Sequence, residues 1–240
     1  RWQWVAPPRI GLDVRNREHT VRNIIDWKPT VVVHLAYRKD DASTIVEGSA
    51  NVAEGAAACG ARLLHLSSDM VFAGREADYT EDDRPDGVVD YGRWKAEAER
   101  RVADVHPSAL LIRTSLLYGT RRLAPWQEDI RDRKPITWFT DEIRAPAHVD
   151  DVARAIVALA SRSDVTGPLH VAGPEAVSRA GLTHAIAGRM HLPDGTVQMG
   201  RIADADAHIH TTRPGRIVLD SNRAATLGIR CRSLAEALAR

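Results

Sequence analysis

Short apolar runs alternate with longer amphipathic segments along most of this chain. Residues 30–36 (TVVVHLA) form a continuous β-branched run, which is typical of a parallel strand covered on both faces. The predicted strands are residues 12–14, 30–36, 62–67, 109–115 and 169–172, and the predicted helices are residues 17–26, 44–59, 90–105, 150–160 (capped by Asp150 or Asp151) and 178–190. Strands that alternate with helices predict an α/β fold with a parallel, doubly wound, Rossmann-like sheet.

Three segments break this alternation and are rich in Pro, Arg and Asp. They are residues 74–89, 120–146 and 192–214. Insertions of this kind suit a smaller lobe that binds substrate. We therefore predict a Rossmann-like core formed by residues 1–119 and 147–175, and a substrate-binding lobe formed by residues 120–146 and 176–240.

Composition excludes several classes of protein. Hydrophobic residues make up 44% of the 240 residues and charged residues 27%, which are values of an ordinary folded protein and not of a disordered one. The formal net charge of +1 gives no general basic field for nucleic acid. Two cysteines are too few for a disulfide framework or a cysteine zinc site. The apolar runs are too short to span a membrane, and the N-terminus does not resemble a signal peptide, so we expect a soluble, cytoplasmic protein.

Tyr91 and Lys95 are the first candidates for chemistry. They are four residues apart at the start of a predicted helix, which places both side chains on one face. A free phenol has a pKa of about 10, and lowering it by three units requires about 4 kcal/mol. One cation roughly 4 Å away, at an effective dielectric of about 20, supplies energy of that order. The lysine is therefore sufficient to make Tyr91 a proton-transferring group. Two exposed residues on the surface of a helix, without any catalytic role, would have the same spacing.

Ser67 and Ser68 follow a predicted strand about two dozen residues upstream of Tyr91. Ligands of parallel sheets bind beyond the carboxyl ends of the strands, where this hydroxyl pair is expected. A serine there is able to donate to a substrate carbonyl oxygen while the tyrosine delivers a proton. Serines at strand ends are commonly turn formers, but the order of Ser68, Tyr91 and Lys95 favours the catalytic interpretation.

Three segments together resemble the extended short-chain dehydrogenase/reductases. They are residues 67–74 (SSDMVFAG), 91–95 (YGRWK) and 113–119 (RTSLLYG). The branch that they resemble most is the dTDP-4-dehydrorhamnose reductase family. The similarity continues through residues 12–14, 31–37, Asn51, 141–152, 212–220 and 227–229, and it covers nearly the whole chain in the family's order.

The resemblance implies a reaction and a set of residues. By similarity, hydride passes from NADPH or NADH to the 4-keto carbon of a nucleotide-linked deoxysugar, and Tyr91 protonates the resulting alkoxide. Ser68, Tyr91 and Lys95 match the catalytic triad, in which the lysine lowers the pKa of the tyrosine and holds the nicotinamide ribose. The residues matched to cofactor binding are Asp13, Val14, Leu35, Ala36, Tyr37, Ser67, Tyr91, Lys95, Thr114 and Ser115. The residues matched to substrate binding are Ser68, Asp69, Leu116, Arg144 and Arg213, with the two arginines as candidates for the substrate diphosphate.

The chain departs from the family in two respects. The family begins with a strand and a Gly-x-x-Gly-x-x-Gly turn that binds the cofactor pyrophosphate, whereas the only glycine before Gly48 here is Gly11. We expect the chain to be a piece of a longer protein for this reason. Leu116, Met70 and His34 also replace the family's usual Trp, Tyr and Asn, which leaves the particular sugar undetermined.

Two other functions stay open. Arg144 and the segment RPGR at residues 213–216 are compatible with an NAD-dependent epimerase or dehydratase of a nucleotide sugar. Some relatives in the superfamily are regulatory subunits without catalysis, as in the methionine adenosyltransferase β subunit, and the missing glycine-rich turn favours that reading. His208 and His210 lie near Asp204 and Asp206, but this pattern is more typical of a polar surface, so we expect no metal. Neither nucleic acid nor a membrane is an expected partner, and a homodimer is one arrangement that the sequence leaves open.

Overall fold

The centre of the molecule is a parallel sheet. The computed structural model describes residues 3–7 and 11–239. Its four-stranded sheet has the order β1-β2-β3-β8, formed by Val31–His34, Arg62–Ser68, Leu110–Thr114 and Gly167–His170. All three neighbouring pairs of strands are parallel. The predicted α/β fold with a parallel, Rossmann-like sheet is confirmed.

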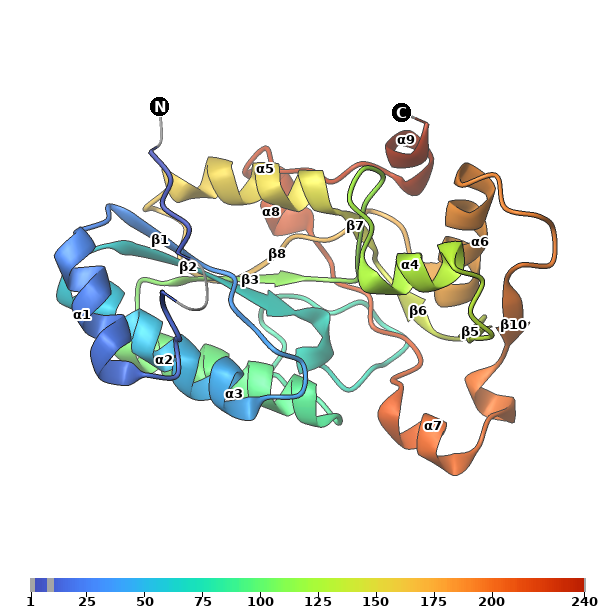
Figure 1. Ribbon diagram of the computed structural model, residues 1–240, viewed down its shortest axis with the longest axis horizontal. Helices are drawn as coiled ribbons and strands as arrows, with labels where there is room; N and C mark the ends of the chain where they lie inside the picture. The colour runs from blue at the N-terminus through green and yellow to red at the C-terminus, as the bar shows by residue number, and fades with distance from the viewer. Residues whose placement is uncertain (1–2, 8–10, 240) are drawn as a thin grey trace.

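Helices cover both faces of this sheet (Figure 1). The helices α1 (Arg17–Trp27), α2 (Ala42–Ala58) and α3 (Asp90–Val105) lie on one side, and α5 (Val149–Ala160) and α8 (Asn222–Thr226) lie on the other. Neighbouring residues of a strand point to opposite faces, and the core follows this rule. Leu63 and Leu111 pack with α2 and α3, whereas Leu64 and Leu110 pack with α5. Each strand is therefore apolar on both faces, which explains its continuous hydrophobic run.

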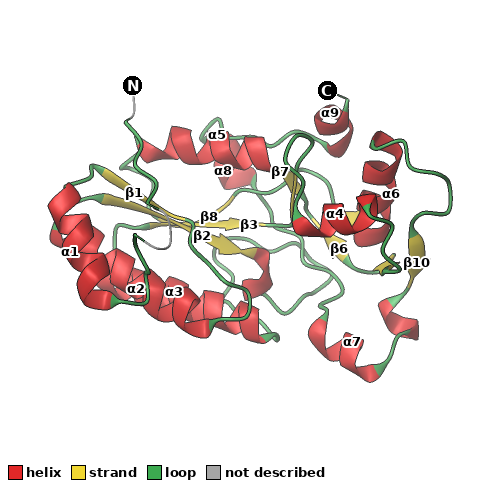
Figure 2. Ribbon diagram, viewed as in Figure 1, coloured by secondary structure: helices red, strands yellow, loops and turns green. Residues whose placement is uncertain are grey.

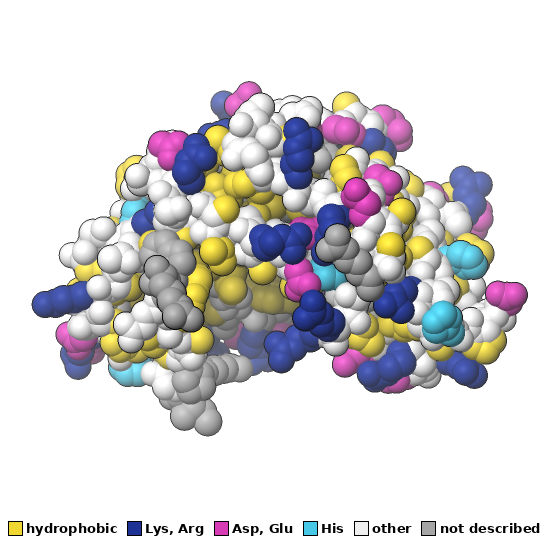
Figure 3. All heavy atoms as spheres, turned by 90° about the horizontal axis from the view of Figure 1, so that it is seen from above, with side chains coloured by type: hydrophobic (Ala, Val, Ile, Leu, Met, Phe, Trp, Pro, Cys, Tyr) yellow, Lys and Arg dark blue, Asp and Glu magenta, His cyan; other side chains and the backbone are white. Residues whose placement is uncertain are grey.

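The α5 side of β1 and β2 is the less covered side. Val31, Val33 and Leu66 point to this side and are only partly buried. Seen from above, this face is hollowed near its middle, where hydrophobic side chains gather, and charged side chains lie beside the hollow toward α4 and α6 (Figure 3). The hollow exposes apolar surface near the carboxyl ends of the central strands.

A second group of elements packs beyond the ends of β3 and β8 (Figure 2). It contains α4 (Pro125–Arg131), β5 (Thr137–Phe139), α6 (Arg179–Arg189), β10 (Gln198–Gly200), η2 (Ile202–Asp204), α7 (Ala207–Thr212) and α9 (Leu234–Leu238). Short paired strands connect it to the sheet: β4 (Leu117–Tyr118) with β7 (Ala147–His148), and β6 (Ile143–Arg144) with β9 (Val177–Ser178). Tyr118, Ile130, Leu182 and Ile186 form part of its own core. The boundaries proposed for two domains stay a prediction.

Two local predictions were wrong. Residues 12–14 are not a strand, because their backbone is satisfied in other ways: the Asp13 carbonyl accepts from the Asn16 amide at 3.0 Å, and the Val14 carbonyl accepts from the Asn51 side chain at 2.9 Å. The cap of α5 is His148, not Asp150 or Asp151, and its ring accepts from the Asp150 amide at 3.2 Å. Imidazole is an unusual cap, so the sequence favoured the aspartates. Within residues 3–7 and 11–239, no helix has the length and apolar character that crossing a bilayer requires.

Candidate active site

Ser68 and Tyr91 meet beyond the carboxyl end of β2. Ser68 is the last residue of that strand and caps the short 3-10 helix η1 (Asp69–Val71), where its oxygen accepts from the Met70 amide at 3.2 Å. Tyr91 lies in the first turn of α3 and is half-buried. The Ser68 side chain is near enough to this phenol to lower its pKa. The structure thus brings together the two hydroxyl groups that the sequence paired.

A glycine allows α3 to approach η1 this closely. A Cβ built on Gly92 would lie 2.0 Å from the Met70 carbonyl oxygen, which is far inside van der Waals contact. Gly87 is similar, because its Cβ would lie 2.7 Å from the same oxygen. Gly92 follows Tyr91 directly, so the absence of its side chain sets the distance between the phenol and Ser68.

Lys95 is buried one turn further along α3. Its side chain is about 5% exposed, its Nζ donates to the Leu66 carbonyl at 2.9 Å, and the same atom lies 5.8 Å from the centre of the Tyr37 ring. Burial lowers the pKa of Lys95 to about 8, and the carboxylate of Glu99 partly opposes this effect. The ammonium is thus held by a strand carbonyl.

The expected effect of Lys95 on Tyr91 is not what this structure shows. Burial raises the pKa of the Tyr91 phenol above its ordinary value of 10.0, Tyr37 and Asp69 raise it further, and Ser68 lowers it. Because the phenol is largely removed from water, its charged form is disfavoured. Tyr91 is therefore a neutral hydrogen-bond donor at neutral pH, and the predicted lowering of its pKa was wrong for this state of the protein.

Asp69 connects the two strand ends beneath these residues. Its carboxyl group is buried, the Ser115 hydroxyl donates to Oδ2 at 2.6 Å, and the Ser68 hydroxyl donates to Oδ1 at 3.1 Å. Arg144 lies near the same group, with 3.9 Å between Nε and Oδ2. Burial raises the pKa of Asp69, while Arg144 and the two hydroxyls lower it. Asp69, listed among substrate-binding residues by the sequence, is thus enclosed by protein groups.

The residues predicted to bind the cofactor occupy two environments. At the end of β1, Leu35, Ala36 and Tyr37 are exposed. At the ends of β2 and β3, the hydroxyls of Ser67 and Thr114 are buried and have no hydrogen-bond partner. Buried hydroxyls without partners are uncommon, and a polar ligand group at the strand ends would satisfy them. That these residues bind the nicotinamide and ribose end of NAD(P) stays a prediction.

Asp13 and Val14 lie in the irregular segment before α1. The Asp13 carboxylate binds the Arg15 guanidinium at 2.5 Å. Val14 is buried against α2, where a Cβ on Gly48 would lie 2.6 Å from its Cγ2. Their predicted place beside an adenine stays a prediction.

The two candidate arginines for a diphosphate differ. Arg144 is buried, and its terminal nitrogens donate to the carbonyls of Ile143, Pro214 and Gly215 at 2.8–3.2 Å. Arg213 is 40% exposed and pairs with the buried Glu142 at 3.1 Å. Arg144 therefore fixes the chain segments around it, and Arg213 is the arginine whose side chain still reaches solvent.

Arg179 and Leu116 complete this side of the site. Leu116 is partly buried against the apolar core of the second group of elements, which includes Trp138. The guanidinium of Arg179 lies 4.7 Å from the centre of the Trp126 ring and 5.0 Å from that of Trp138. One of its terminal nitrogens has no hydrogen-bond partner. Sequence reasoning missed Arg179, because an arginine in the first turn of a helix carries no distinguishing signal.

A buried pair of histidines was also missed. The rings of His34 and His65 are stacked with 5.3 Å between their centres. His34 Nε2 lies 3.1 Å from the Ser49 hydroxyl, whereas neither ring nitrogen of His65 has a partner. Burial lowers the pKa of His34 to about 3, and the charge of Lys95 adds to this effect. Both rings are therefore neutral, and they form a polar layer between the sheet and the helices.

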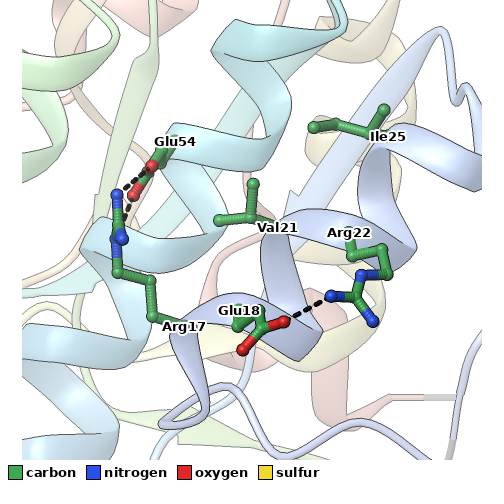
Figure 4. Close-up of a pocket in the computed structure, with 6 residues that line it drawn as sticks. All are labelled: Arg17, Glu18, Val21, Arg22, Ile25 and Glu54. Atoms are coloured by element: carbon green, nitrogen blue, oxygen red, sulfur yellow. Dashed lines mark hydrogen bonds and ion pairs between the residues drawn. The ribbon is translucent and has the colours of Figure 1, made fainter.

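A separate pocket of about 340 Å³ lies on the outer surface of α1 (Figure 4). Its charged side chains pair with one another: Arg17 with Glu54 at 2.5 Å, and Arg22 with Glu18. None of the predicted site residues lines it. In the part of the chain that the structure describes, no group of three or more His, Cys, Asp or Glu side chains is arranged to hold a metal ion.

Comparisons with known proteins agree with this fold. The family model of the RmlD substrate binding domain matches residues 1–240. The methionine adenosyltransferase 2 subunit beta of Bos taurus is 31% identical over 92% of this chain and 71% of its own length. A probable low-salt glycan biosynthesis reductase of Haloferax volcanii is 28% identical over 92% of this chain and 79% of its own. Among solved structures, a dTDP-4-dehydrorhamnose reductase from Bacillus anthracis in complex with NADP has a TM-score of 0.82 at 23% identity, covering 97% of this chain and 86% of that one.

Proposed function

This chain belongs to the family of the RmlD substrate binding domain, and from that premise we propose that it reduces the 4-keto group of a nucleotide-linked deoxysugar with NADPH or NADH. In this proposal Tyr91 gives the proton that the product hydroxyl requires. Such a reduction is a step of carbohydrate biosynthesis. The reductase from Haloferax volcanii supports the assignment, because this chain is similar to most of its length.

The observation that carries the proposal is the position of Tyr91 near Ser68, whose side chain lowers the pKa of the phenol. The two hydroxyls lie beyond the carboxyl end of a parallel strand, where open α/β sheets bind their ligands. A neutral phenol beside a serine hydroxyl is a proton donor with a second hydrogen-bonding group next to it. This pair is suited to a substrate oxygen that gains negative charge.

A bound nicotinamide cofactor would supply the hydride. In the described residues, the buried hydroxyls of Ser67 and Thr114 and the exposed Tyr37 would hold its nicotinamide and ribose end. Lys95 would contribute a positive charge near the ribose.

The raised pKa of Tyr91 fits the role of a proton donor, but it also means that the phenolate formed after proton transfer is unstable. A phenol that stays protonated at neutral pH is in the form that a donor needs, but the phenolate left behind is poorly solvated. Lys95 is the nearest candidate to compensate that charge, since it is one helical turn away. To do so, its ammonium would exchange the Leu66 carbonyl for the Tyr91 oxygen.

Arg213 is the better of the two candidates for the substrate diphosphate. Its side chain is partly exposed, and it pairs with the carboxylate of Glu142. The sequence around Arg144 was compatible with an epimerase or dehydratase. The structure gives this alternative less support, because the terminal nitrogens of Arg144 donate to backbone carbonyls. Ser68 and Leu116 would face the sugar.

A regulatory subunit is the second candidate function. The observation that favours it is the similarity to the β subunit of methionine adenosyltransferase 2, at 31% identity over 92% of this chain. In that role, nucleotide binding would stabilise a surface that contacts a catalytic partner, and Tyr91 would have no proton to transfer.

One pair of assays separates the two functions. The full-length protein is mixed with NADPH or NADH and a 4-keto-6-deoxy sugar nucleotide, and oxidation of the cofactor is followed. Turnover supports the reductase. Absence of turnover, together with a change in methionine adenosyltransferase activity when the protein is added to that enzyme, would contradict the reductase and support the regulatory subunit.

A further inference from the structure

Glu142 is a buried acid that faces three arginines. Its side chain is 9% exposed, and its Oε2 accepts from Nη1 of Arg213 at 3.1 Å. Its other oxygen, Oε1, lies 3.5 Å from Nη2 of Arg144 and 4.0 Å from Nε of Arg179. One negative charge therefore lies among three positive charges.

The three arginines come from separate parts of the chain. Arg144 belongs to β6, Arg179 to the first turn of α6, and Arg213 directly follows α7. Glu142 also joins two of these segments through its backbone, because its carbonyl accepts from the Arg179 amide at 2.8 Å. The fold thus brings three distant cations to one side chain.

Two of the arginines are enclosed by protein. Arg144 is 5% exposed and donates to the Pro214 carbonyl at 2.9 Å. Arg179 is 11% exposed, and its guanidinium lies 4.7 Å from the centre of the Trp126 ring and 5.0 Å from that of Trp138. These contacts fix both side chains beside Glu142.

Arg213 differs from the other two, because 40% of its side chain is exposed. A partly exposed ion pair is weak, so Arg213 loses little when it exchanges Glu142 for another anion. A second acid, Asp69, lies 3.9 Å from Nε of Arg144. Among these five side chains the arginines still leave at least one positive charge in surplus, and Arg213 is the arginine that solvent reaches most.

We propose that Glu142 is an internal counter-ion for Arg213, and that the diphosphate of a nucleotide-linked sugar takes its place when the sugar binds. Arg213 then turns from Glu142 to the phosphate oxygens, which its planar guanidinium is suited to bind in pairs. Arg144 and Arg179 stay beside Glu142 and balance its charge. This inference rests on the proposed function, in which Arg213 binds the substrate diphosphate, and it makes Glu142 a positioning residue that acts through Arg213.

The exchange has a consequence that a purely structural acid would not have. The diphosphate competes with Glu142 for Arg213, and the carboxylate also repels it. Glu142→Gln removes this charge and keeps an oxygen that is able to accept from Arg213. The variant therefore binds a diphosphate more tightly than the wild type, whereas loss of a structural support would leave binding unchanged or weaken it.

Calorimetric titration of the full-length, cofactor-free protein tests the exchange, with thymidine diphosphate and uridine diphosphate as separate probes. Glu142→Gln should bind the better probe about tenfold more tightly than the wild type, and Arg213→Gln about tenfold more weakly. When Arg213→Gln is already present, adding Glu142→Gln should change the dissociation constant by less than about threefold. Glu54→Gln is the matched control, because Glu54 pairs with Arg17 on α1, and it should bind as the wild type does.

Three results of this titration overturn the proposal. The first is equal or weaker binding by Glu142→Gln. The second is the same tightening with and without the Arg213 side chain, because the effect would then not pass through Arg213. The third is that neither diphosphate binds to the wild type or to Glu142→Gln.

A second measurement needs no change at Glu142. The guanidinium N–H signals of the wild type are followed by NMR as the diphosphate is added, with Arg213→Lys and Arg179→Lys to assign them. The Arg213 signals should shift and those of Arg179 should stay, and unchanged Arg213 signals at saturation overturn the proposal. Both measurements omit the cofactor and the sugar, so failure of the reductase assay contradicts the proposed function alone and leaves this result standing.

Discussion

Gly92 of α3 lies against the carbonyl oxygen of Met70, and a Cβ at position 92 would come within 2.0 Å of that oxygen. The contact joins the helix that carries Tyr91 to the short helix that follows Ser68. Neither segment is able to yield easily, because the Met70 amide is bound to Ser68 and the residues around it are buried. The spacing of the two reactive hydroxyls therefore depends on a residue without a side chain.

Replacement of Gly92 by Ala is expected to separate Tyr91 from Ser68. The new methyl group must displace backbone, so we expect the free energy of unfolding to fall by about 1–3 kcal/mol. A displacement of roughly 1 Å at the site is expected to lower the turnover of sugar nucleotide by about 100-fold. Gly188→Ala in α6 is the matched control, since its Cβ meets nothing within 4 Å, and it should be neutral or stabilising by up to about 1 kcal/mol. Equal effects of the two substitutions would contradict this account.

Replacement of Lys95 by Met tests the cost of the buried ammonium. Its pKa is about 8 in the folded protein against 10.5 for a free lysine, so the unfolded chain binds more protons between these values and wild-type stability rises with pH from 8 to 10.5. Below pH 8, burial of the charged Lys95 lowers the free energy of unfolding by about 3 kcal/mol. The hydrogen bond to the Leu66 carbonyl returns about 1 kcal/mol of this. Lys95→Met should therefore be the more stable protein at pH 7, and its advantage should shrink as the pH rises. Denaturant unfolding at several pH values measures this, and a difference that is constant with pH would be evidence against it.

His34 is expected to make the fold sensitive to acid. Its pKa is lowered to about 3, so the unfolded chain binds a proton below pH 6.5 that the folded protein does not, and stability falls with pH from 6.5 toward 3. His34→Asn keeps a donor toward Ser49 without this proton. Between pH 6.5 and 4.5 the wild type should lose about 2–3 kcal/mol more of its unfolding free energy than the variant. Parallel curves of stability against pH would show that His34 is not the source.

The buried pair of Glu99 and Arg113 is expected to matter for stability more than for chemistry. Their closest atoms are 2.8 Å apart, and both side chains are at most 5% exposed. Glu99→Gln leaves the Arg113 charge buried without its partner, which should cost about 3–5 kcal/mol. The double variant Glu99→Leu with Arg113→Met should recover most of this loss in denaturant unfolding. If the single and double variants were equally unstable, the unpaired charge would not be the cause.

The alternation of apolar runs was enough to predict the sheet and the helices that cover it. The predicted ranges 30–36 and 109–115 contain the observed strands β1 and β3. A strand that is buried on both faces is a continuous apolar run, which is easy to recognise in a sequence. Residues 12–14 were mistaken for a strand. Their three residue types do not reveal that the Asn51 side chain donates to the Val14 carbonyl in place of a neighbouring strand. The strands of the second group are two or three residues long and pair across long loops, which leaves no periodic signal.

The sequence predicted which residues lie near one another at the candidate site, but not the electrostatics around them. Spacing placed Tyr91, Lys95 and Ser68 together, and in the structure Ser68 is near enough to Tyr91 to lower the pKa of the phenol. Spacing does not reveal that Lys95 would bind a strand carbonyl, nor that burial would raise the pKa of the phenol. Arg144 shows the same limit, because its partners are carbonyl oxygens that no sequence motif encodes.

The most direct measurement is oxidation of NADPH by the full-length protein with a 4-keto-6-deoxy sugar nucleotide, compared between the wild type and Tyr91→Phe. Both proteins should bind NADPH equally in a calorimetric titration, which shows that the variant is folded. Loss of the general acid should lower turnover by about 100- to 10,000-fold. Equal turnover in the two proteins would contradict the assignment of Tyr91 as the proton donor.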